Sequence, residues 1–486
     1  INLATWDGEL YLEMHRGTFT TKSNLKKANR TLEFKLRETE LRAALASLTG
    51  TSYPSEELTE CYKKFLLNQF HDILPGSHIH PVYEDAMNDY SSVSERLDAM
   101  LALTAGNEYF NSLNFTRSSI TFIEDENGAI TRHGVKGFWS IPTLAGLSTG
   151  TVAALPFNEN WLSTEFCDKC DCLVVETPYY RAKLSSDGSF VSLYDKELDR
   201  EWVKEGCGFN KLHLYADNPG VYDAWDILPN YKDVQVALNV DKPLALVSSD
   251  GSSAEFAVTF TTEKSTWKMI LRFFADSRAI EVENVVDWDE KHKLVKVNFG
   301  PDVLTRELVC DTSAGFVKRD LTKNTSWQQA RFEVCHHKWC DMSESGSGIA
   351  IINEGKYGVG LEKDEISLSL LRATIRPDIT SDIGHHDFCY TILPHSGDAV
   401  EAQVNKTAME YNVPLCKSNV TVPAALRDTL NNCGLYLQAM KRSEDGQYLI
   451  LRLSEQDGRR GKIAFPFEVQ TMNLIEDIEG STKVVS

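Results

Sequence analysis

The hydrophobic period of the chain changes once, near Gly106, and this change limits the folds that are open to it. Three segments before Gly106, residues 23–48, 55–72 and 81–105, repeat apolar residues at helical spacing. After Gly106 the apolar residues alternate, or form short β-branched runs bounded by turn residues. The sequence therefore predicts an α+β multidomain chain, in which an antiparallel three-helix bundle is followed by large antiparallel β-sandwich domains.

The three predicted helices have recognisable starts. Ser23 can cap the free amides of the first helix. Ser55 is the expected cap of the second helix, and Pro81 suits the first turn of the third. The connections between the helices are short, which favours antiparallel packing.

The predicted strands begin soon after Gly106 and continue almost to the end of the chain. Each is a run of alternating or β-branched residues with turn residues on both sides. The segments are 118–125, 150–157, 171–185, 188–195, 253–263, 267–276, 279–288, 292–299, 348–354, 357–363, 364–373, 446–456 and 462–469.

Charge and composition exclude two classes of partner. The 486 residues carry 70 acidic and 50 basic side chains, a net charge of −20, whereas nucleic acids and anionic membranes require a basic surface. The sequence has no run of about 18 apolar residues, so we expect no membrane span. Eleven cysteines, an odd number, favour a mostly reduced compartment over a fully paired secreted framework.

The segment GELYLEMHRG, residues 8–17, is expected to form a strand with two unlike faces. The faces carry Leu10, Leu12 and Met14 on one side, and Glu9, Tyr11, Glu13 and His15 on the other. The polar face is either the lining of a pocket or an ordinary solvated surface.

The stretch NQFHDILPGSHIH, residues 68–80, is the first candidate for a metal site. It places His71 and Asp72 at the end of a predicted helix, before a proline–glycine break. Imidazole is a common zinc ligand, and an adjacent carboxylate can bind a substrate hydroxyl. By spacing alone a capping or surface role is more frequent for this pair, and for the loop residues His78 and His80.

Three other stretches contain side chains that suit zinc. They are CDKCDC (167–172), CHHKWCD (335–341) and GHHDFCY (384–390). A zinc knuckle at the first would need a second cysteine pair at a finger-like distance, which the sequence lacks. In the other two, the histidines could simply form hydrogen bonds between strands.

Several long motifs support a more specific assignment. In chain order they are GELYLEMHRGTFTTKSNLKKANR, NQFHDILPGS, DNPGVYDAWDI, FEVCHHKWCDMSE, LSLLRATIRPD and DFCYTILPH. Together they resemble glycoside hydrolase family 38, the zinc-dependent α-mannosidases, and most closely the branch of cytosolic and vacuolar enzymes with their bacterial relatives. Tyr222 stands where that branch has a tryptophan.

The resemblance implies an organisation of the chain. In that family a (β/α) domain carries most of the active site, and a three-helix bundle and β-sandwiches follow it. Residues 1–20 would then be a remnant of the end of the (β/α) catalytic domain, residues 21–107 the three-helix bundle, residues 108–400 a large β-sandwich domain, and residues 401–486 a C-terminal β domain.

The resemblance also implies roles for individual residues. His71 would be one of four ligands of a catalytic Zn²⁺. Glu13 is the candidate catalytic carboxylate, and Arg376 and Asp382 are weaker candidates for contact with the sugar. The candidate substrate-binding residues are Asp72, His15, Arg16 and Arg372.

The family's His-x-Asp pair and nucleophile aspartate would lie upstream of Ile1. We therefore expect the C-terminal portion of a zinc-dependent retaining α-mannosidase, as a fragment or a processed subunit, which is inactive without its N-terminal half. Its expected partners are that half, an oligomannose or other α-mannoside, and a second copy in a homo-oligomer, but no nucleic acid and no membrane. The alternative is a non-catalytic β-sandwich module that binds glycan or assembles subunits. A cytoplasmic and a vacuolar or lysosomal location both stay open.

Overall fold

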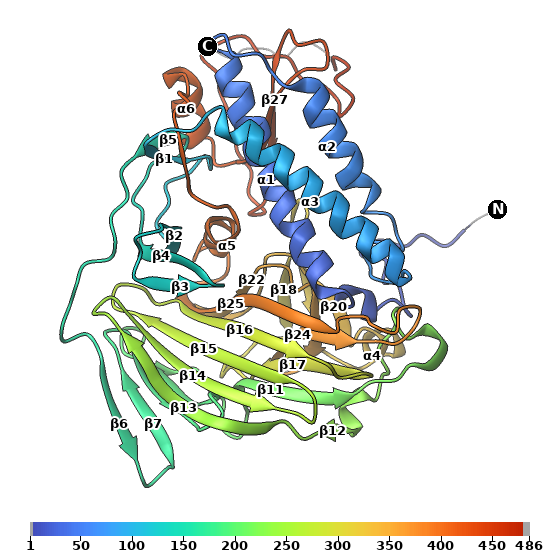
Figure 1. Ribbon diagram of the computed structural model, residues 1–486, viewed down its shortest axis with the longest axis vertical. Coiled ribbons are helices and arrows are strands. Elements are labelled where there is room, and N and C mark those ends of the chain that lie inside the picture. The colour runs from blue at the N-terminus through green and yellow to red at the C-terminus, as the bar shows by residue number, and fades with distance from the viewer. Residues whose placement is uncertain (1–2, 480–486) are drawn as a thin grey trace.

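The structure is a computed structural model, and it describes residues 3–479. Helices lie above layers of β-sheet (Figure 1). The helices are α1 (Ser23–Ser47), α2 (Ser55–Leu67), α3 (His80–Ala102), α4 (Ser326–Ala330), α5 (Val404–Asn412) and α6 (Ala424–Asn431). Among the described helices, none has the length and apolar character needed to cross a bilayer.

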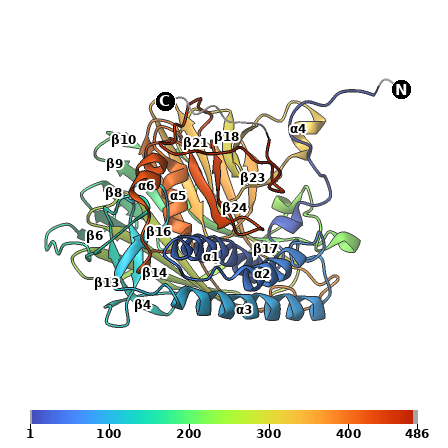
Figure 2. The same cartoon turned by 90° about the horizontal axis from the view of Figure 1, so that it is seen from above.

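Helices α1, α2 and α3 lie side by side (Figure 2). They share a core in which Leu32 of α1, Phe65 of α2 and Val93 of α3 are all buried. The apolar spacing of the sequence explains this packing, because each helix carries its apolar residues on one stripe. The three predicted helices are thus present, while a bundle that folds as a separate unit stays a prediction.

The caps expected at Ser23 and Ser55 are wrong. Each serine is the first residue of its helix, and Lys22 and Pro54 precede them without a side-chain cap. The first amides of α1 are instead bound by the carboxylate of Asp382, which lies 2.7 Å from the backbone nitrogens of both Lys22 and Ser23. A residue 360 positions further along the chain thus replaces the local cap.

Helix α2 ends at Leu67, five residues earlier than expected. Asn68 is buried, and its side-chain amide donates to the carbonyl oxygen of Lys64 and to Asp89 of α3. Tighter turns follow, in which Gln69 and Phe70 donate their backbone amides to residues three positions back. His71 and Asp72 therefore lie in a turn and not on a helix.

Two large sheets form the lower part of the molecule, and every described strand pair is antiparallel. The nine-stranded sheet follows the order β13 (Asn239–Ser249), β14 (Ser253–Thr261), β15 (Thr266–Phe274), β16 (Ile280–Trp288), β25 (Gly384–Ser396), β22 (Ser347–Asn353), β21 (Trp339–Glu344), β18 (Glu307–Thr312) and β19 (Gly315–Asp320).

The eleven-stranded sheet packs against it. Its main path is β20 (Glu333–Cys335), β23 (Gly358–Glu362), β24 (Glu365–Ala373), β17 (Lys293–Phe299), β11 (Phe209–Ala216), β9 (Phe190–Asp195), β8 (Tyr180–Leu184), β7 (Cys172–Glu176) and β6 (Ser163–Cys167), with β10 (Arg200–Glu201) on β9 and β12 (Gln235–Val236) on β11. One apolar cluster joins the two sheets, with Phe209 and Trp267 on opposite sides of it. The expected α+β class with large antiparallel sheets is confirmed.

Three small sheets connect the helices to this sandwich. They are β26 (Cys416–Ser418), β1 (Glu108–Asn111) and β5 (Ser148–Gly150); β2 (Thr121–Glu124), β4 (Val135–Ser140) and β3 (Ile130–Arg132); and the pair β27 (Tyr436–Arg442) and β28 (Leu449–Ser454). The pairing of β26 with β1 joins segments about 300 residues apart. The domain boundaries at residues 20, 107 and 400 stay a prediction.

The segment 8–17 does not form the expected strand. It is coil with a turn at residues 13–14, followed by a 3-10 turn at Gly17–Phe19, and Leu10 and Leu12 are 80% and 66% exposed. Single side-chain contacts hold it, such as the hydrogen bond from the Tyr11 hydroxyl to the Glu333 carbonyl oxygen at 2.6 Å. The alternation predicted a strand, but within the described residues no neighbouring strand pairs with it.

Candidate functional site

Segments from four of the sequence motifs meet at the start of α1. These segments are 16–23, 72–80, 217–227 and 372–382. Gly17 shows how close they are, because a Cβ there would lie 2.6 Å from Arg372 Nη1 and 3.0 Å from the Asp226 carbonyl oxygen. Only glycine fits such a position, and we call this meeting point the motif junction.

Arg372 is at the centre of the motif junction and is 1% exposed. Its Nε donates to Asp217 at 2.6 Å, its Nη1 to the Thr21 hydroxyl at 3.2 Å, and its Nη2 to the Asp226 carbonyl oxygen at 2.5 Å. Asp223 lies beside it, 3.8 Å from Nη2. All three guanidinium nitrogens therefore have partners inside the chain, and a contact of Arg372 with substrate stays a prediction.

Arg16 is tied to the same segments. Its Nη1 lies 3.1 Å from Asp226 Oδ1, and its Nη2 donates to the Ala330 carbonyl oxygen at 2.9 Å. The guanidinium also lies over the Phe332 ring, 4.5 Å from the centroid. Arg16 thereby anchors the end of the N-terminal segment, where Glu13 is exposed and His15 is half-buried.

Asp378 and Lys22 form a buried ion pair on the other side of α1's start, with side chains 2% and 3% exposed. The Thr380 backbone amide donates to Asp378 at 2.8 Å, and His80 Nδ1 lies 3.2 Å from the same carboxylate. Burial opposes the charge of Asp378, but Lys22 and Thr380 outweigh it and lower its pKa from 3.8 to about 2.

This pKa predicts a pH-dependent contribution to stability. A carboxyl group with a lowered pKa in the folded state stabilises the protein above its unfolded pKa, and the contribution disappears as pH falls through about 2. We expect Asp378→Asn to lower the free energy of unfolding by about 2 kcal/mol at pH 7, with the difference narrowing from pH 5 to 2. Denaturant titrations of both proteins across this range measure it, and a difference that does not vary with pH would contradict it.

The loop that carries Asp72 is packed onto the motif junction. Gly76 has φ +88, and a Cβ there would lie 2.6 Å from the Thr21 carbonyl oxygen. The buried ammonium of Lys26 donates to the carbonyl oxygens of Leu74 and Pro75 at 2.9 and 3.2 Å. The proline–glycine break therefore positions the loop by backbone contact.

His71 and Asp72 lie at the rim of the motif junction, with side chains 76% and 48% exposed. His71 Nε2 is 3.3 Å from Asp72 Oδ2, and the imidazole packs beside Phe70 with ring centroids 4.2 Å apart. Ser77 donates to Asp72 Oδ1 at 3.0 Å. Both side chains are thus held near each other with their polar atoms accessible, as a ligand pair requires.

The cysteines of CDKCDC and the first histidine of CHHKWCD have structural partners. Cys170 and Cys172 form a disulfide, which removes them from any zinc knuckle. His336 is fully buried between the Tyr357 carbonyl oxygen and the Asn353 amide, and burial lowers its pKa to about 3. Asp217, Asp223 and Asp226 of the motif junction were not predicted, although all three stand within DNPGVYDAWDI.

Three family profiles match the chain, in an order that agrees with the fold. "Alpha mannosidase middle domain" matches residues 13–106, "Glycosyl hydrolases family 38 C-terminal domain" matches 175–380, and "Glycosyl hydrolases family 38 C-terminal beta sandwich domain" matches 434–486. The first covers α1 to α3, and the second covers most of the two large sheets.

Curated relatives are similar over nearly the whole chain. The chain is 31% identical to "Alpha-mannosidase 2C1" of Homo sapiens, over 94% of this chain and 46% of that protein. It is 28% identical to "Alpha-mannosidase G" of Dictyostelium discoideum (99% and 51%), and 30% identical to "Alpha-mannosidase" of Saccharomyces cerevisiae (85% and 38%). The chain spans about half the length of the curated relatives it matches.

The fold is also similar to a solved structure. The crystal structure of an alpha-mannosidase from Enterococcus faecalis V583 superimposes with a TM-score of 0.69 at 13% identity, over 90% of this chain and 62% of that one. The fold, the profiles and the relatives agree, and the chain belongs to glycosyl hydrolase family 38, whose middle and C-terminal domains it contains.

Proposed function

We propose that the chain is the C-terminal part of a zinc-dependent retaining α-mannosidase that hydrolyses terminal α-D-mannosyl residues of oligosaccharides. The observation that carries this proposal is the exposed pair His71 and Asp72 beside the rigid motif junction. Membership of family 38 supports the reaction class, because the matched relatives are named α-mannosidases.

His71 fits a zinc ligand in its exposure and its contacts. Its imidazole is mostly exposed, and the charged group in contact with it is the carboxylate of Asp72. One imidazole cannot hold zinc alone, since such sites use three or four protein ligands. We propose that the other ligands come from an N-terminal half of the same enzyme.

Each group then has a defined task. Zinc, when bound, would supply positive charge that orients the sugar hydroxyls. Asp72 can accept a hydrogen bond from one of these hydroxyls, while Ser77 fixes its other oxygen. Retaining hydrolysis needs a nucleophilic carboxylate and an acid. We propose Glu13 as a candidate acid/base group, with His15 and Arg16 beside it on the same segment.

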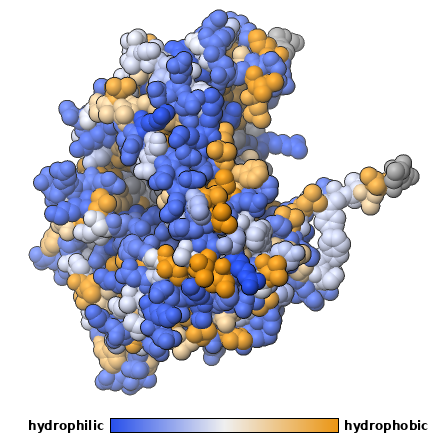
Figure 3. Space-filling view, turned by 45° about the vertical axis from the view of Figure 1, so that its right-hand side comes forward, coloured by the Kyte–Doolittle hydropathy of each residue, from blue (hydrophilic) through white to orange (hydrophobic). Residues whose placement is uncertain are grey.

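An apolar rim supports a covering partner at this place. Leu66, Leu67 and Phe70 are 58%, 63% and 54% exposed, directly before His71. Hydrophobic side chains also gather in separate groups on the face that includes the N-terminal segment (Figure 3). Contiguous exposed apolar side chains mark surfaces that another protein part covers. The homo-oligomer and the compartment stay predictions.

The chain alone is expected to hydrolyse p-nitrophenyl α-mannoside no faster than buffer with zinc. The physical reason is that, under this proposal, it supplies one ligand of the catalytic zinc, and the nucleophile lies in the N-terminal half. The assay compares the purified chain with the same chain after addition of an N-terminal half from a matched relative. Zinc-dependent turnover by the chain alone would exclude the proposed division of the active site, and binding of mannoside without turnover in any combination would favour the non-catalytic module.

A further inference from the structure

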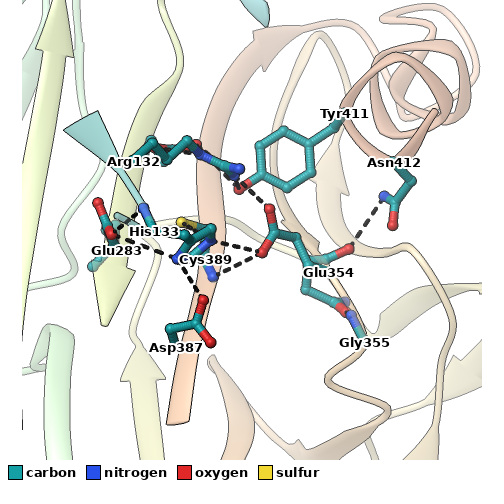
Figure 4. Close-up of polar contacts among 12 residues, drawn as sticks. Arg132, His133, Glu283, Glu354, Gly355, Asp387, Cys389, Tyr411 and Asn412 are labelled. Atoms are coloured by element: carbon teal, nitrogen blue, oxygen red, sulfur yellow. Dashed lines mark hydrogen bonds and ion pairs between the residues drawn. The ribbon is translucent and has the colours of Figure 1, made fainter. Parts of the chain in front are cut away.

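A second group of metal-ligand side chains lies where the β3–β4 hairpin meets the nine-stranded sheet (Figure 4). His133 is in the turn of the hairpin, Glu354 follows β22, and Cys389 is on β25. Their ligand atoms all lie within 4.8 Å of one another, a juxtaposition found once among residues 3–479. Cys389 belongs to GHHDFCY, but the histidines of that stretch take no part.

The distances in this group are close to those of a metal centre. His133 Nε2 lies 3.2 Å from Glu354 Oε2 and 3.3 Å from Cys389 Sγ. Zinc binds nitrogen and oxygen at about 2.0–2.2 Å and sulfur at about 2.3 Å in a tetrahedron, so two of its ligand atoms are about 3.4–3.6 Å apart. Both separations from His133 Nε2 are thus within a few tenths of an ångström of this value, and the third, between Glu354 and Cys389, is at most 4.8 Å.

The far side of the imidazole faces carboxylates. His133 Nδ1 is 3.2 Å from Asp387 Oδ2 and 3.5 Å from Glu283 Oε1. Without a metal, Nε2–H donates to the Glu354 carboxylate, which can only accept, and the buried Nδ1 makes no hydrogen bond. Zinc at Nε2 would displace that proton to Nδ1, which lies beside Asp387 and Glu283. Metal-binding histidines are usually oriented by a carboxylate in this way.

Backbone contacts fix the group. The His133 amide donates to Glu283 Oε1 at 2.8 Å, and the Cys389 amide donates to Glu354 Oε2 at 3.2 Å. His133 also has φ +49, an uncommon conformation for a side-chain-bearing residue. The three ligands are thus held together by the chain itself.

The side chains around the three proposed ligands carry more negative than positive charge. The Glu354 carboxylate pairs with Arg132 through Oε1, and its Oε2 accepts from His133 Nε2 and from the Cys389 amide. The group has five carboxylates and three permanent cations, an excess of two negative charges: Glu255, Glu281, Glu283, Glu354 and Asp387 against Arg132, Arg272 and Lys27.

Two species could reduce this excess of negative charge. A second proton on His133 adds one positive charge. Zn²⁺ that replaces the Cys389 thiol proton also adds one, because the proton leaves to solvent as the zinc–sulfur bond forms. The Cys389 sulfur, 3.3 Å from His133 Nε2, is only a weak hydrogen-bond acceptor for an imidazolium. Thiolate sulfur is a preferred zinc ligand.

We propose that His133, Glu354 and Cys389 form a zinc site, with water in the fourth position, that ties the β3–β4 hairpin to the nine-stranded sheet. It is separate from the site at His71 and does not depend on mannosidase activity. The side chains of His133 and Glu354 are 14% and 17% exposed, so the ion and one water can reach them.

The first test is the metal content of the purified chain after zinc loading and dialysis against metal-free buffer. We expect about one zinc per chain, and less than about 0.2 in Cys389→Ala and His133→Ala. His71→Ala should keep its zinc, as should Cys340→Ala, which removes an equally buried thiol from β21 of the same sheet. Zinc-free wild-type protein, or full zinc in Cys389→Ala, would overturn the proposal.

The second test needs no variant that has to fold. Cobalt(II) loaded in place of zinc should show a thiolate charge-transfer band in the near ultraviolet and the intense visible bands of a tetrahedral centre. Weak octahedral bands without the sulfur transition would mean that Cys389 does not bind the metal. That result would sink the zinc site and leave the proposed function untouched.

Discussion

Replacing His71 with alanine in the complete enzyme is expected to lower kcat/KM by about a hundredfold or more, since loss of a direct ligand should cost at least as much as loss of an outer-shell partner. The zinc content should fall with it. The physical reason is that the exposed imidazole of His71, in the turn after α2, is the nitrogen ligand that we propose for the catalytic ion. Metal analysis and p-nitrophenyl α-mannoside kinetics on the same preparation measure both effects.

A matched control is another exposed histidine that contacts an aspartate. His385 is 60% exposed and contacts Asp287 at 2.9 Å, as His71 contacts Asp72. His385→Ala should leave rate and catalytic zinc unchanged. If His71→Ala has the same zinc content and the same kcat/KM as the wild-type enzyme, His71 is not a ligand, even if the family assignment stands.

The second large effect is on stability. Arg372→Met should lower the free energy of unfolding by about 3–5 kcal/mol, because removal of one member of a buried pair leaves the other charge unpaired. Asp217 is 1% exposed and Asp223 is 0% exposed, so neither carboxylate can recover its hydration. Urea denaturation followed by circular dichroism measures the loss.

Two further variants separate the ion pair from general damage. Adding Asp217→Asn to Arg372→Met removes one unpaired charge and should recover part of the loss. Lys63→Met, which removes the exposed pair of Lys63 with Glu60, should cost less than about 1 kcal/mol. Equal losses in Arg372→Met and Lys63→Met would mean that the motif junction contributes little to stability.

The sequence predicted those parts of the fold that depend on local pattern. The apolar stripes of α1, α2 and α3 predicted each helix to within a few residues, because a long amphipathic repeat has one stable solution. Residues 8–17 and 150–157 also alternate, yet neither segment is a strand over that range. Alternation indicates which side chains share a face, but it does not supply the neighbouring strand.

The candidate site was predictable only where a motif identified it. His71 and Asp72 were candidates from their place before the proline–glycine break, and the resemblance to family 38 gave them specific roles, which stay predictions. The partners of Arg372 were not predictable, because Asp217 is 155 residues away and Thr21 is 351 residues away. His133 lies in the β3–β4 turn, Glu354 follows β22, and Cys389 lies within β25, so no short motif could have joined them.

The cap of α1 by Asp382 has a consequence for synthesis of the chain. The two residues that form this contact are 360 positions apart, and ribosomes add about 5–20 residues per second. The amides of Lys22 and Ser23 therefore wait on the order of 20–70 seconds for their acceptor. During this time the start of α1 lacks its cap, and the loop that carries Asp72 lacks its final support. A chaperone would therefore be most useful while the helices have been synthesised and Asp382 has not.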